Sequence, residues 1–250
     1  MRVMQAAALT ALTAWLTLAL LAQLGPDWTL FAPATCLATH CFCERPRVGD
    51  LMLQPANSWS SFGFVLMGFW IMLGAAPGRA LGRLPAIWFG FTAVVIGVGS
   101  VLLHATLTLW GQFADVLGMY LLGAFTLTWA VMRWRGLTPA VAIAFYIAVA
   151  GGLIGLLWLV PDTRRWAFAV LLVVAIAVEW WLARPRRVAV RGGWLLAGLG
   201  ANALAFGMWI LDQTRLVCAP DSLLQGHAVW HLLGAVAVAC SLVYYAGERR

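Results

Sequence analysis

A serine, a histidine and an aspartate interrupt an apolar part of the chain. The stretch from Gly99 to Leu107 contains Ser100 and His104, and Asp115 follows eleven residues after the histidine. Ser100 and His104 are four residues apart, so they share one face of a helix. A hydroxyl, an imidazole and a carboxylate in such a setting are candidates for catalysis or metal binding.

A second stretch, Gly226–His231, has the same four-residue spacing between His227 and His231. These two residues and His104 make up three of the chain's four histidines. Neutral histidine nitrogens are preferred zinc ligands, and three protein ligands leave the fourth position for water. We therefore expect the fold to bring the three imidazoles together around zinc.

Zinc at this site would favour hydrolytic chemistry, because it lowers the pKa of a bound water to roughly 7. Asp115 is a candidate to take a proton from that water and later deliver it to a leaving group. Ser100 is a candidate to orient the water or to donate a hydrogen bond to a developing oxyanion. Each residue also has a structural explanation. The Ser100 hydroxyl can bond back to its own helix, Asp115 can cap a helix, and a single histidine can bond between helices.

The composition indicates an integral membrane protein. Of the residues, 63% are hydrophobic and 10% are charged, whereas soluble domains average about 45–50% and about 25%. The apolar stretches are about 20 residues long, which suits helices that cross roughly 30 Å of hydrocarbon. The net charge of +7 comes from arginines scattered between these stretches. Membrane topology explains that placement, and we do not expect nucleic-acid binding.

The pattern of apolar stretches predicts an all-α membrane protein with eight spans in a single domain. The predicted spans are residues 5–24, 57–75, 86–107, 113–133, 139–159, 165–183, 193–211 and 227–246. Only the connections 25–56 and 212–226 are long. The first span is alternatively a signal peptide, but Ala22-Gln23-Leu24 is a poor cleavage site, so we favour an uncleaved helix.

Arginine placement predicts the orientation of the spans. With the N-terminus inside, eleven arginines lie in inner segments and five in outer segments. An excess of basic residues marks the cytoplasmic side, so we expect both termini in the cytoplasm. We expect the protein itself in the bacterial inner membrane. The inner set is Arg2, Arg79, Arg83, Arg133, Arg135, Arg184, Arg186, Arg187, Arg191, Arg249 and Arg250.

This topology places the polar residues of the two stretches at one depth. The third span runs outward and ends near His104, and the fourth starts outside, just before Asp115. The eighth span also starts outside, with His227 and His231 in its first two turns. Ionisable groups within spans are costly and usually functional. Their shared depth near the outer face favours a zinc site over the separate structural explanations.

Four cysteines fall in the two long outer connections: Cys36, Cys41, Cys43 and Cys218. An oxidising outer compartment favours two disulfides, and four cysteines allow three pairings. We expect one bridge to tie segment 25–56 to segment 212–226. Free thiols are the alternative, and a metal site is less favoured because His40 is the only histidine nearby.

Several motifs of the chain resemble the alkaline ceramidase family, within the wider superfamily that includes the adiponectin receptors. The stretch Gly97–Leu107 resembles the family's Gly-x-Gly-Ser-x-x-x-His-x-Thr-Leu segment, and Asp115 falls where the family has its aspartate. The stretch Gly226–His231 resembles the family's C-terminal His-Ala-x-Trp-His. Shorter resemblances are Cys43-Glu44, Asn57-Ser58-Trp59-Ser60, and Trp209-Ile210-Leu211-Asp212 with Cys218 following. The match covers about residues 41–246.

The resemblance implies a seven-helix hydrolase core, formed here by residues 57–250. Residues 26–56 are then an outer cysteine-containing loop, and residues 1–25 are an additional N-terminal transmembrane helix. The resemblance also implies hydrolysis of a lipid amide, most directly ceramide, to a sphingoid base and a fatty acid. It implies zinc held by three histidines with two catalytic residues beside it, and two disulfides. These residues are His104, His227 and His231, then Ser100 and Asp115, and the pairs Cys43 with Cys218 and Cys36 with Cys41.

The segment that binds calcium in eukaryotic family members departs from the family pattern. Glu44 is present, but Cys41 stands where an aspartate is expected and Pro46 where an asparagine is expected, and Gln54 replaces a glutamate. Calcium needs several oxygen ligands, usually with carboxylates among them. These substitutions argue against a calcium site.

Three further polar residues are expected to give structural support: Glu44, Asn57 and Asp212. Glu44 can pair with a neighbouring arginine, Arg45 or Arg47, or cap a helix. Asp212 is expected to fix the outer loop through hydrogen bonds. Glu179, near the inner end of the sixth span, is expected to pair with Arg184.

We expect a zinc-dependent hydrolase of lipid amides, embedded in the membrane, whose substrate enters sideways from the bilayer. We expect no obligatory protein partner. The alternative is a zinc-containing lipid receptor or sensor with negligible turnover, but the cytoplasmic segments are short and carry no signalling domain. A transporter is least supported, because the chain shows no internal repeat and no broken helix pair.

Overall fold

The computed structural model describes residues 1–39, 41–75, 81–186 and 191–248 of the 250-residue chain. Within these residues the structure is helical, and eight helices are long and apolar enough to cross a membrane. The prediction of an all-α, multi-pass membrane protein is confirmed. The helices are α1 (Arg2–Leu24), α2 (Pro55–Gly74), α3 (Arg83–Thr106), α4 (Leu109–Arg135), α5 (Pro139–Leu159), α6 (Arg164–Ala177), α7 (Gly192–Gln213) and α8 (Gly226–Ala246).

Short helical turns lie between the long helices. They are the 3-10 turns η1 (Trp28–Leu30), η2 (Thr35–Thr39), η3 (Pro161–Thr163) and η5 (Arg184–Arg186), and the π-helical segment η4 (Val178–Ala183), which extends α6. The eight long helices agree with the predicted spans to within a few residues, if α6 is taken together with η4. Four arginines of the predicted inner set lie outside the described residues: Arg79, Arg187, Arg249 and Arg250. His40, the histidine near the cysteines, lies outside them as well.

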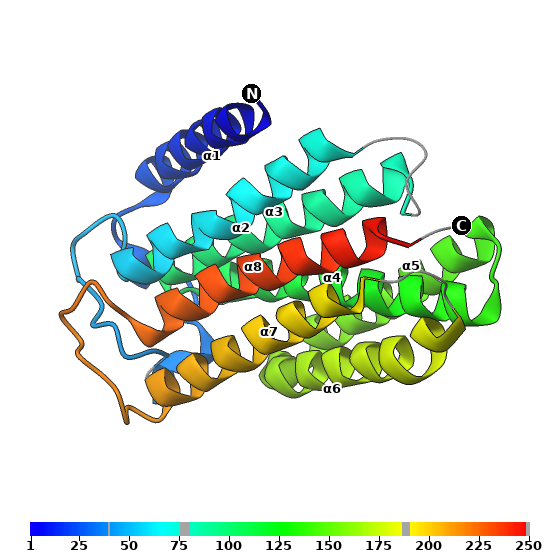
Figure 1. Ribbon diagram of the computed structural model, residues 1–250. Coiled ribbons are helices and arrows are strands. Elements are labelled where there is room, and N and C mark those ends of the chain that lie inside the picture. Colours follow the sequence, from blue (N-terminus) through cyan, green and yellow to red (C-terminus); the bar gives the residue numbers. More distant parts are fainter. Residues whose placement is uncertain (40, 76–80, 187–190, 249–250) are drawn as a thin grey trace.

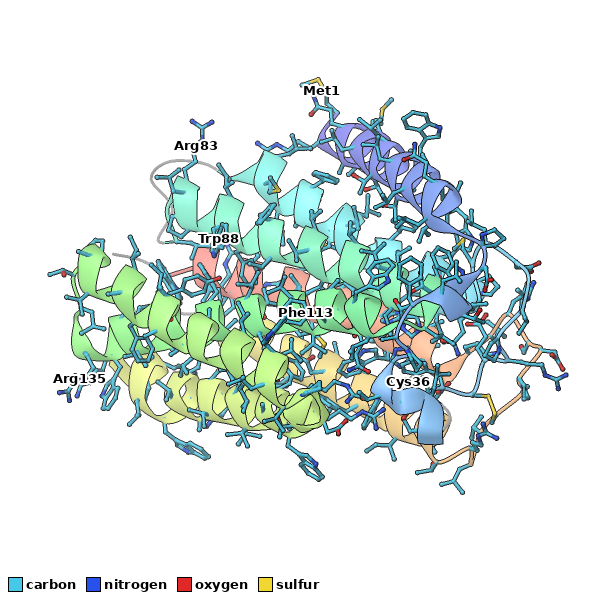
Figure 2. All side chains as sticks on the ribbon, turned by 180° about the vertical axis from the view of Figure 1, so that it is seen from behind. Met1, Cys36, Arg83, Trp88, Phe113 and Arg135 are labelled. Carbon is cyan, nitrogen blue, oxygen red and sulfur yellow. A yellow bond between two sulfur atoms is a disulfide. The ribbon has the colours of Figure 1, made fainter. Side chains whose placement is uncertain are left out.

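The helices form a bundle in which α3 lies between α2 and α4. Helix α8 packs on α2 and α7, and α4 also packs on α5 and α6 (Figure 1). Helix α1 packs on α2 at the periphery. The two long connections lie at one end of the bundle, which we call the outer end after the predicted orientation, and the start of α1 and the end of α8 lie toward the opposite, inner end (Figure 1). Arg83 and Arg135 likewise lie at the end opposite to Cys36 (Figure 2).

The starts of the helices follow from local sequence. Thr108 precedes α4, and its hydroxyl accepts a hydrogen bond from the Gly111 backbone N–H at 3.2 Å. Pro55 and Pro139 occupy the first positions of α2 and α5, where a missing N–H costs nothing. Thr138 caps α5 by accepting from the backbone of Val141. Caps of this kind satisfy N–H groups that the first turn of a helix leaves unpaired.

Glycine at position 99 lets α3 and α4 approach closely. A β-carbon on Gly99 would lie 2.2 Å from the carbonyl oxygen of Ala114 and 2.8 Å from the backbone nitrogen of Asp115. Any larger residue would therefore push the two helices apart. Because Ser100 follows Gly99 directly, this contact holds the serine at the height of Asp115.

The outer segment 25–54 completes the C-terminal end of α3. The last carbonyls of a helix lack partners within the helix. Here the backbone N–H of Gln54 donates to the His104 carbonyl at 3.0 Å, and that of Leu53 donates to Ala105 at 3.0 Å. Leu107 ends the helix in the left-handed conformation, with φ at 48°. The outer segment is thus fixed to the turn that carries His104.

Two disulfides stabilise the outer end. Cys43 is bonded to Cys218, which joins the two long connections, and Cys36 is bonded to Cys41 within the first connection. Both pairs are those that the family resemblance implies. The fifth cysteine, Cys240, is a buried free thiol in α8.

The inner end holds a buried ion-pair cluster that differs from the prediction. Glu179 pairs with Arg133 of α4, and the Tyr244 hydroxyl donates to Glu179 Oε1 at 2.5 Å. Glu248 is a second carboxylate partner of Arg133. The predicted pairing of Glu179 with Arg184 is wrong, because Glu179 faces the bundle interior whereas the Arg184 guanidinium lies over the ring of Trp180.

Candidate metal centre

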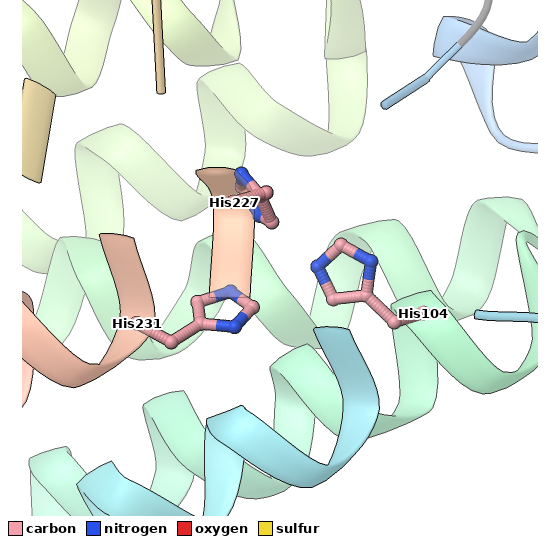
Figure 3. A group of neighbouring side chains, drawn as sticks. All are labelled: His104, His227 and His231. Atoms are coloured by element: carbon pink, nitrogen blue, oxygen red, sulfur yellow. The ribbon is translucent and has the colours of Figure 1, made fainter. Parts of the chain in front are cut away.

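The three histidines of the two sequence stretches meet at the outer end of the bundle. His104 comes from the last turns of α3, and His227 and His231 come from the first two turns of α8 (Figure 3). One nitrogen from each ring lies within 4.8 Å of the others. All three side chains are buried, and the rings are turned toward a common space (Figure 3). The arrangement can hold a metal ion.

Two serines of α2 determine which nitrogen of His231 carries hydrogen. Ser60 Oγ and Ser61 Oγ lie 2.9 Å and 3.2 Å from His231 Nδ1. Both hydroxyls donate their hydrogen to the carbonyl oxygen of Asn57, at 2.9 Å and 2.7 Å. They can therefore only accept from Nδ1–H, since a hydroxyl has one hydrogen to give. His231 Nε2 therefore carries no hydrogen, which is the form that binds metal.

Gln54 performs the same function for His104. Its side-chain Nε2 donates to the carbonyl of Glu44 at 2.8 Å, which fixes the orientation of the amide. Its Oε1, 2.9 Å from His104 Nδ1, must then accept a hydrogen bond from the Nδ1–H of the ring. His104 Nε2 has no hydrogen-bond partner among the described residues although it is fully buried. This nitrogen is free to act as a ligand.

His227 contributes the third ring through its place at the start of α8. Its Nδ1 is buried and has no hydrogen-bond partner in the described part of the chain. Buried polar atoms without partners are rare and call for an explanation such as an ion. Two of the three histidines in this cluster have such a nitrogen. Three histidine nitrogens are a ligand set that zinc accepts. The residues present could therefore hold a metal ion.

Ser100 and Asp115 lie beside the histidines. Ser100 Oγ is 3.1 Å from His231 Nε2, so its hydroxyl bonds across the bundle rather than to its own helix. The Asp115 carboxylate faces the Ser100 hydroxyl. It does not cap α4, because Thr108 does. Both residues line the same cavity as His227 and His231.

The cavity next to the histidines is large and mostly apolar. Its volume is about 220 Å³. The polar wall includes His227, His231, Ser100 and Asp115, with Arg164 and Arg165 at the start of α6. The remaining wall is largely aromatic and aliphatic, including Phe64, Phe89, Phe168, Phe206, Trp209 and Trp230. Such a space suits an elongated apolar ligand with one polar part.

Asp212 connects the outer disulfide to the metal centre. Its two carboxylate oxygens accept from the backbone N–H groups of Cys43 and His227, at 3.0 Å and 3.1 Å. Gly226 lies against this side chain, and a β-carbon there would be 3.1 Å from Asp212 Cβ. The carboxylate thus holds the first turn of α8 in place, and no contact of Asp212 with the cavity is described.

Glu44 caps α2, which decides between the alternatives left by the sequence. Its carboxylate oxygens accept from the backbone N–H groups of Ala56 and Asn57, at 2.8 Å and 2.9 Å. Burial raises the pKa of the Glu44 carboxyl, although both N–H groups favour its ionised form. Arg45 pairs with Asp221 in the other connection. Asn57 supports the site through its backbone, while its buried side-chain atoms have no hydrogen-bond partner among the described residues.

A family model described as Ceramidase matches residues 36–249. The chain belongs to the ceramidase family. A search of curated proteins finds no significant match. The family match includes all three histidines, Ser100 and Asp115, whereas α1 lies outside it. Membership of the ceramidase family supports hydrolysis of the amide bond of ceramide and implies an amidohydrolase.

Three residues of this ceramidase-family site were not predicted in their roles. The sequence indicates Gln54 only as the replacement of a calcium ligand, whereas in the structure it contacts His104. Ser60 and Ser61 were part of or next to a family motif, but their contact with His231 was not foreseen. The available signal was weak: a serine pair in an apolar helix is common, and the partner ring is 170 residues away.

Proposed function

We propose that the protein is a zinc-dependent amidohydrolase that acts on ceramide or a related lipid amide within the membrane. The observation that carries this proposal is the group of three buried imidazoles, two of them with Nδ1–H bound outward and Nε2 without a hydrogen. Ser100 and Asp115 border the same cavity. The family match supplies the class of substrate.

His104 and His231 would hold zinc through Nε2, and His227 would provide the third nitrogen. Three neutral imidazoles favour zinc over the oxygen-preferring metals calcium and magnesium. When bound, zinc supplies a Lewis acid for the amide carbonyl and lowers the pKa of a water in its open position. Gln54, Ser60 and Ser61 keep the rings in the tautomer that this binding needs.

Asp115 and Ser100 would carry the proton and the charge. Asp115 accepts a proton as the water oxygen forms its bond to the carbonyl carbon. Ser100 donates a hydrogen bond to the oxygen that becomes negative. Asp115 then returns the proton to the amide nitrogen as the C–N bond breaks. The products are a fatty acid and an amine, so atoms and charge balance.

The cavity would hold the aliphatic part of the lipid, with its amide at the histidines. Substrate would enter sideways from the bilayer, because the cavity lies within the membrane-spanning bundle. We place this end of the bundle at the outer face and both termini in the cytoplasm, in the bacterial inner membrane. The excess of arginine in the opposite connections supports this orientation.

The test is metal analysis of the purified protein combined with a ceramide hydrolysis assay. We expect about one zinc per chain and release of fatty acid that chelation abolishes and zinc restores. His104→Ala should lose bound zinc and at least about 100-fold in activity, since it removes a ligand. Thr128→Ala is the matched control, because it removes a buried polar group of α4 that does not line the cavity.

Two results would contradict the proposal. One is wild-type protein that binds zinc but releases no fatty acid from any lipid amide, which would favour a lipid sensor. The other is His104→Ala protein with the metal content and activity of the wild type.

A further inference from the structure

Two arginines line the cavity next to the histidines, and the proposed hydrolysis does not use them. Arg164 and Arg165 are the first two residues of α6. Among the described residues that line the cavity, Asp115 is the only carboxylate that faces these two guanidinium groups. The wall therefore carries more positive than negative charge before any metal is added.

Arg164 is held by neutral oxygen atoms. Its side chain is only 10% exposed. Nη1 donates to Thr35 Oγ1 at 2.7 Å and to the carbonyl of Pro161 at 3.2 Å. The one carboxylate within ion-pair distance, Asp162, is 3.8 Å away and 81% exposed, so solvent screens that pair. In the described structure Nε and Nη2 make no hydrogen bond, which leaves donors for a ligand.

Arg165 lies next to Arg164 along the same wall. Its Nη2 donates to Gln213 Oε1 at 3.3 Å, and its guanidinium lies 5.5 Å from the ring centroid of Trp209. Gln213 in turn donates to the carbonyl of Cys41 at 2.5 Å. The described contacts of Arg165 include no carboxylate within 4 Å. This guanidinium is positioned by neutral groups of α7, as Arg164 is by neutral groups of the outer segment.

A largely buried guanidinium such as that of Arg164 is costly unless a partner compensates its charge, and Arg165 adds a second positive charge at the exposed rim of the same cavity. The planar fork of arginine matches the two oxygens of a carboxylate, phosphate or sulfonate. Two neighbouring forks on the wall of a mostly apolar cavity, which one carboxylate also lines, indicate that the missing negative charge comes from the ligand.

We propose that Arg164 and Arg165 form a subsite for an oxyanion carried by a lipid. This inference rests on the proposed function, since it concerns the same cavity and the same class of ligand. The oxyanion has two possible sources. It is either an acidic head group on the lipid amide that is cleaved, or the carboxylate of the fatty acid that hydrolysis releases.

Binding measured without turnover tests the subsite. The protein is full-length His104→Ala, with metal-depleted wild type in parallel, and the probes are two matched pairs. The first pair is ceramide 1-phosphate and ceramide, and the second is laurate and lauryl alcohol. We expect the anionic member of at least one pair to bind at least about tenfold tighter. The pair that shows the preference identifies the source of the oxyanion.

Substitutions locate the preference. Arg165→Gln should remove most of it, and Arg164→Lys should reduce it because the charge stays but the fork is lost. Arg165 is the safer position for folding, since its side chain lies at the exposed rim. Arg45→Gln is the control, because it removes an exposed arginine outside the cavity and should leave the preference intact.

The inference is overturned if neither pair shows a preference, or if Arg165→Gln and Arg164→Lys both retain it. The arginines would then serve only to anchor the outer segment and α7. These results are independent of hydrolysis: an inactive protein with the preference disproves only the proposed function, and an active protein without it disproves only the subsite.

Discussion

At the scale of single residues, the metal centre depends on side chains that do not touch the metal position. Gln54 is 1% exposed and bonds both the His104 ring and the Glu44 carbonyl. Ser60 and Ser61 share the Nδ1–H of His231. Partners of this kind orient a ligand and fix its tautomer before the metal arrives.

Gln54→Ala should weaken zinc binding by roughly 10- to 100-fold, because the His104 ring loses the acceptor that fixes Nδ1–H. Gln54→Glu should recover most of that affinity, since a carboxylate oxygen can also accept from Nδ1–H. Competition with a chelator of known affinity measures both variants. Equal zinc affinity in Gln54→Ala and the wild type would show that the contact has no part in positioning His104.

At the scale of elements, the outer connections hold α3 and α8 in register. The first connection is bonded to the last turn of α3 through Leu53 and Gln54, and to α7 and α8 through Asp212 and the Cys43–Cys218 bridge. The two helices that carry the histidines make few contacts with each other directly. Helix α2 packs on both of them, and the connections add a second constraint on the distance between His104 and the two histidines of α8.

The two disulfides should differ in their effect on stability. The Cys43–Cys218 bridge spans 175 residues, whereas Cys36–Cys41 spans 5. In the chain-entropy model the disulfide that closes the longer loop stabilises the folded state by about 5 kcal/mol, and the one that closes the shorter loop by about 2 kcal/mol. Cys43→Ser/Cys218→Ser should thus lower the melting temperature more than Cys36→Ser/Cys41→Ser, as thermal unfolding in detergent would show. The reverse order would mean that the long bridge is not a main constraint on the fold.

The helices were predictable from sequence, but the contacts between them were only partly so. Apolar stretches of membrane length fix α2 to α8 within a few residues, because lipid leaves the backbone no alternative to helix. Counting spans also placed His104, His227 and His231 at one depth. Gln54 lies in an irregular segment without periodicity, and Glu179 faces inward from a π-helical segment, so neither partner could be derived from spacing.

At the scale of the whole molecule, charge is buried at both ends of the bundle. The outer end holds the largely buried Arg164 beside the cavity, and the inner end holds Arg133 with Glu179 and Glu248. Arg133 joins α4 to η4 and to the end of α8, and its guanidinium lies 5.0 Å from the ring centroid of Tyr245. One cation thereby links three segments that are distant in sequence.

Arg133→Ala should be strongly destabilising, by about 3–5 kcal/mol, because two buried carboxylates lose their cation. Adding Glu179→Gln and Glu248→Gln to it should restore part of that loss, since the uncompensated charges are removed with the arginine. Thermal unfolding of the single and triple variants measures the difference. A triple variant less stable than Arg133→Ala would mean that packing around Arg133, rather than charge balance, dominates.

The division of the metal ligands between α3 and α8 has a consequence for biosynthesis. Helices enter the membrane in the order of translation, so His104 is in place while His227 and His231 are still to be made. The Cys43–Cys218 bridge also has to wait for the segment before α8. A nascent chain therefore cannot bring the three histidines together until α8 has been inserted.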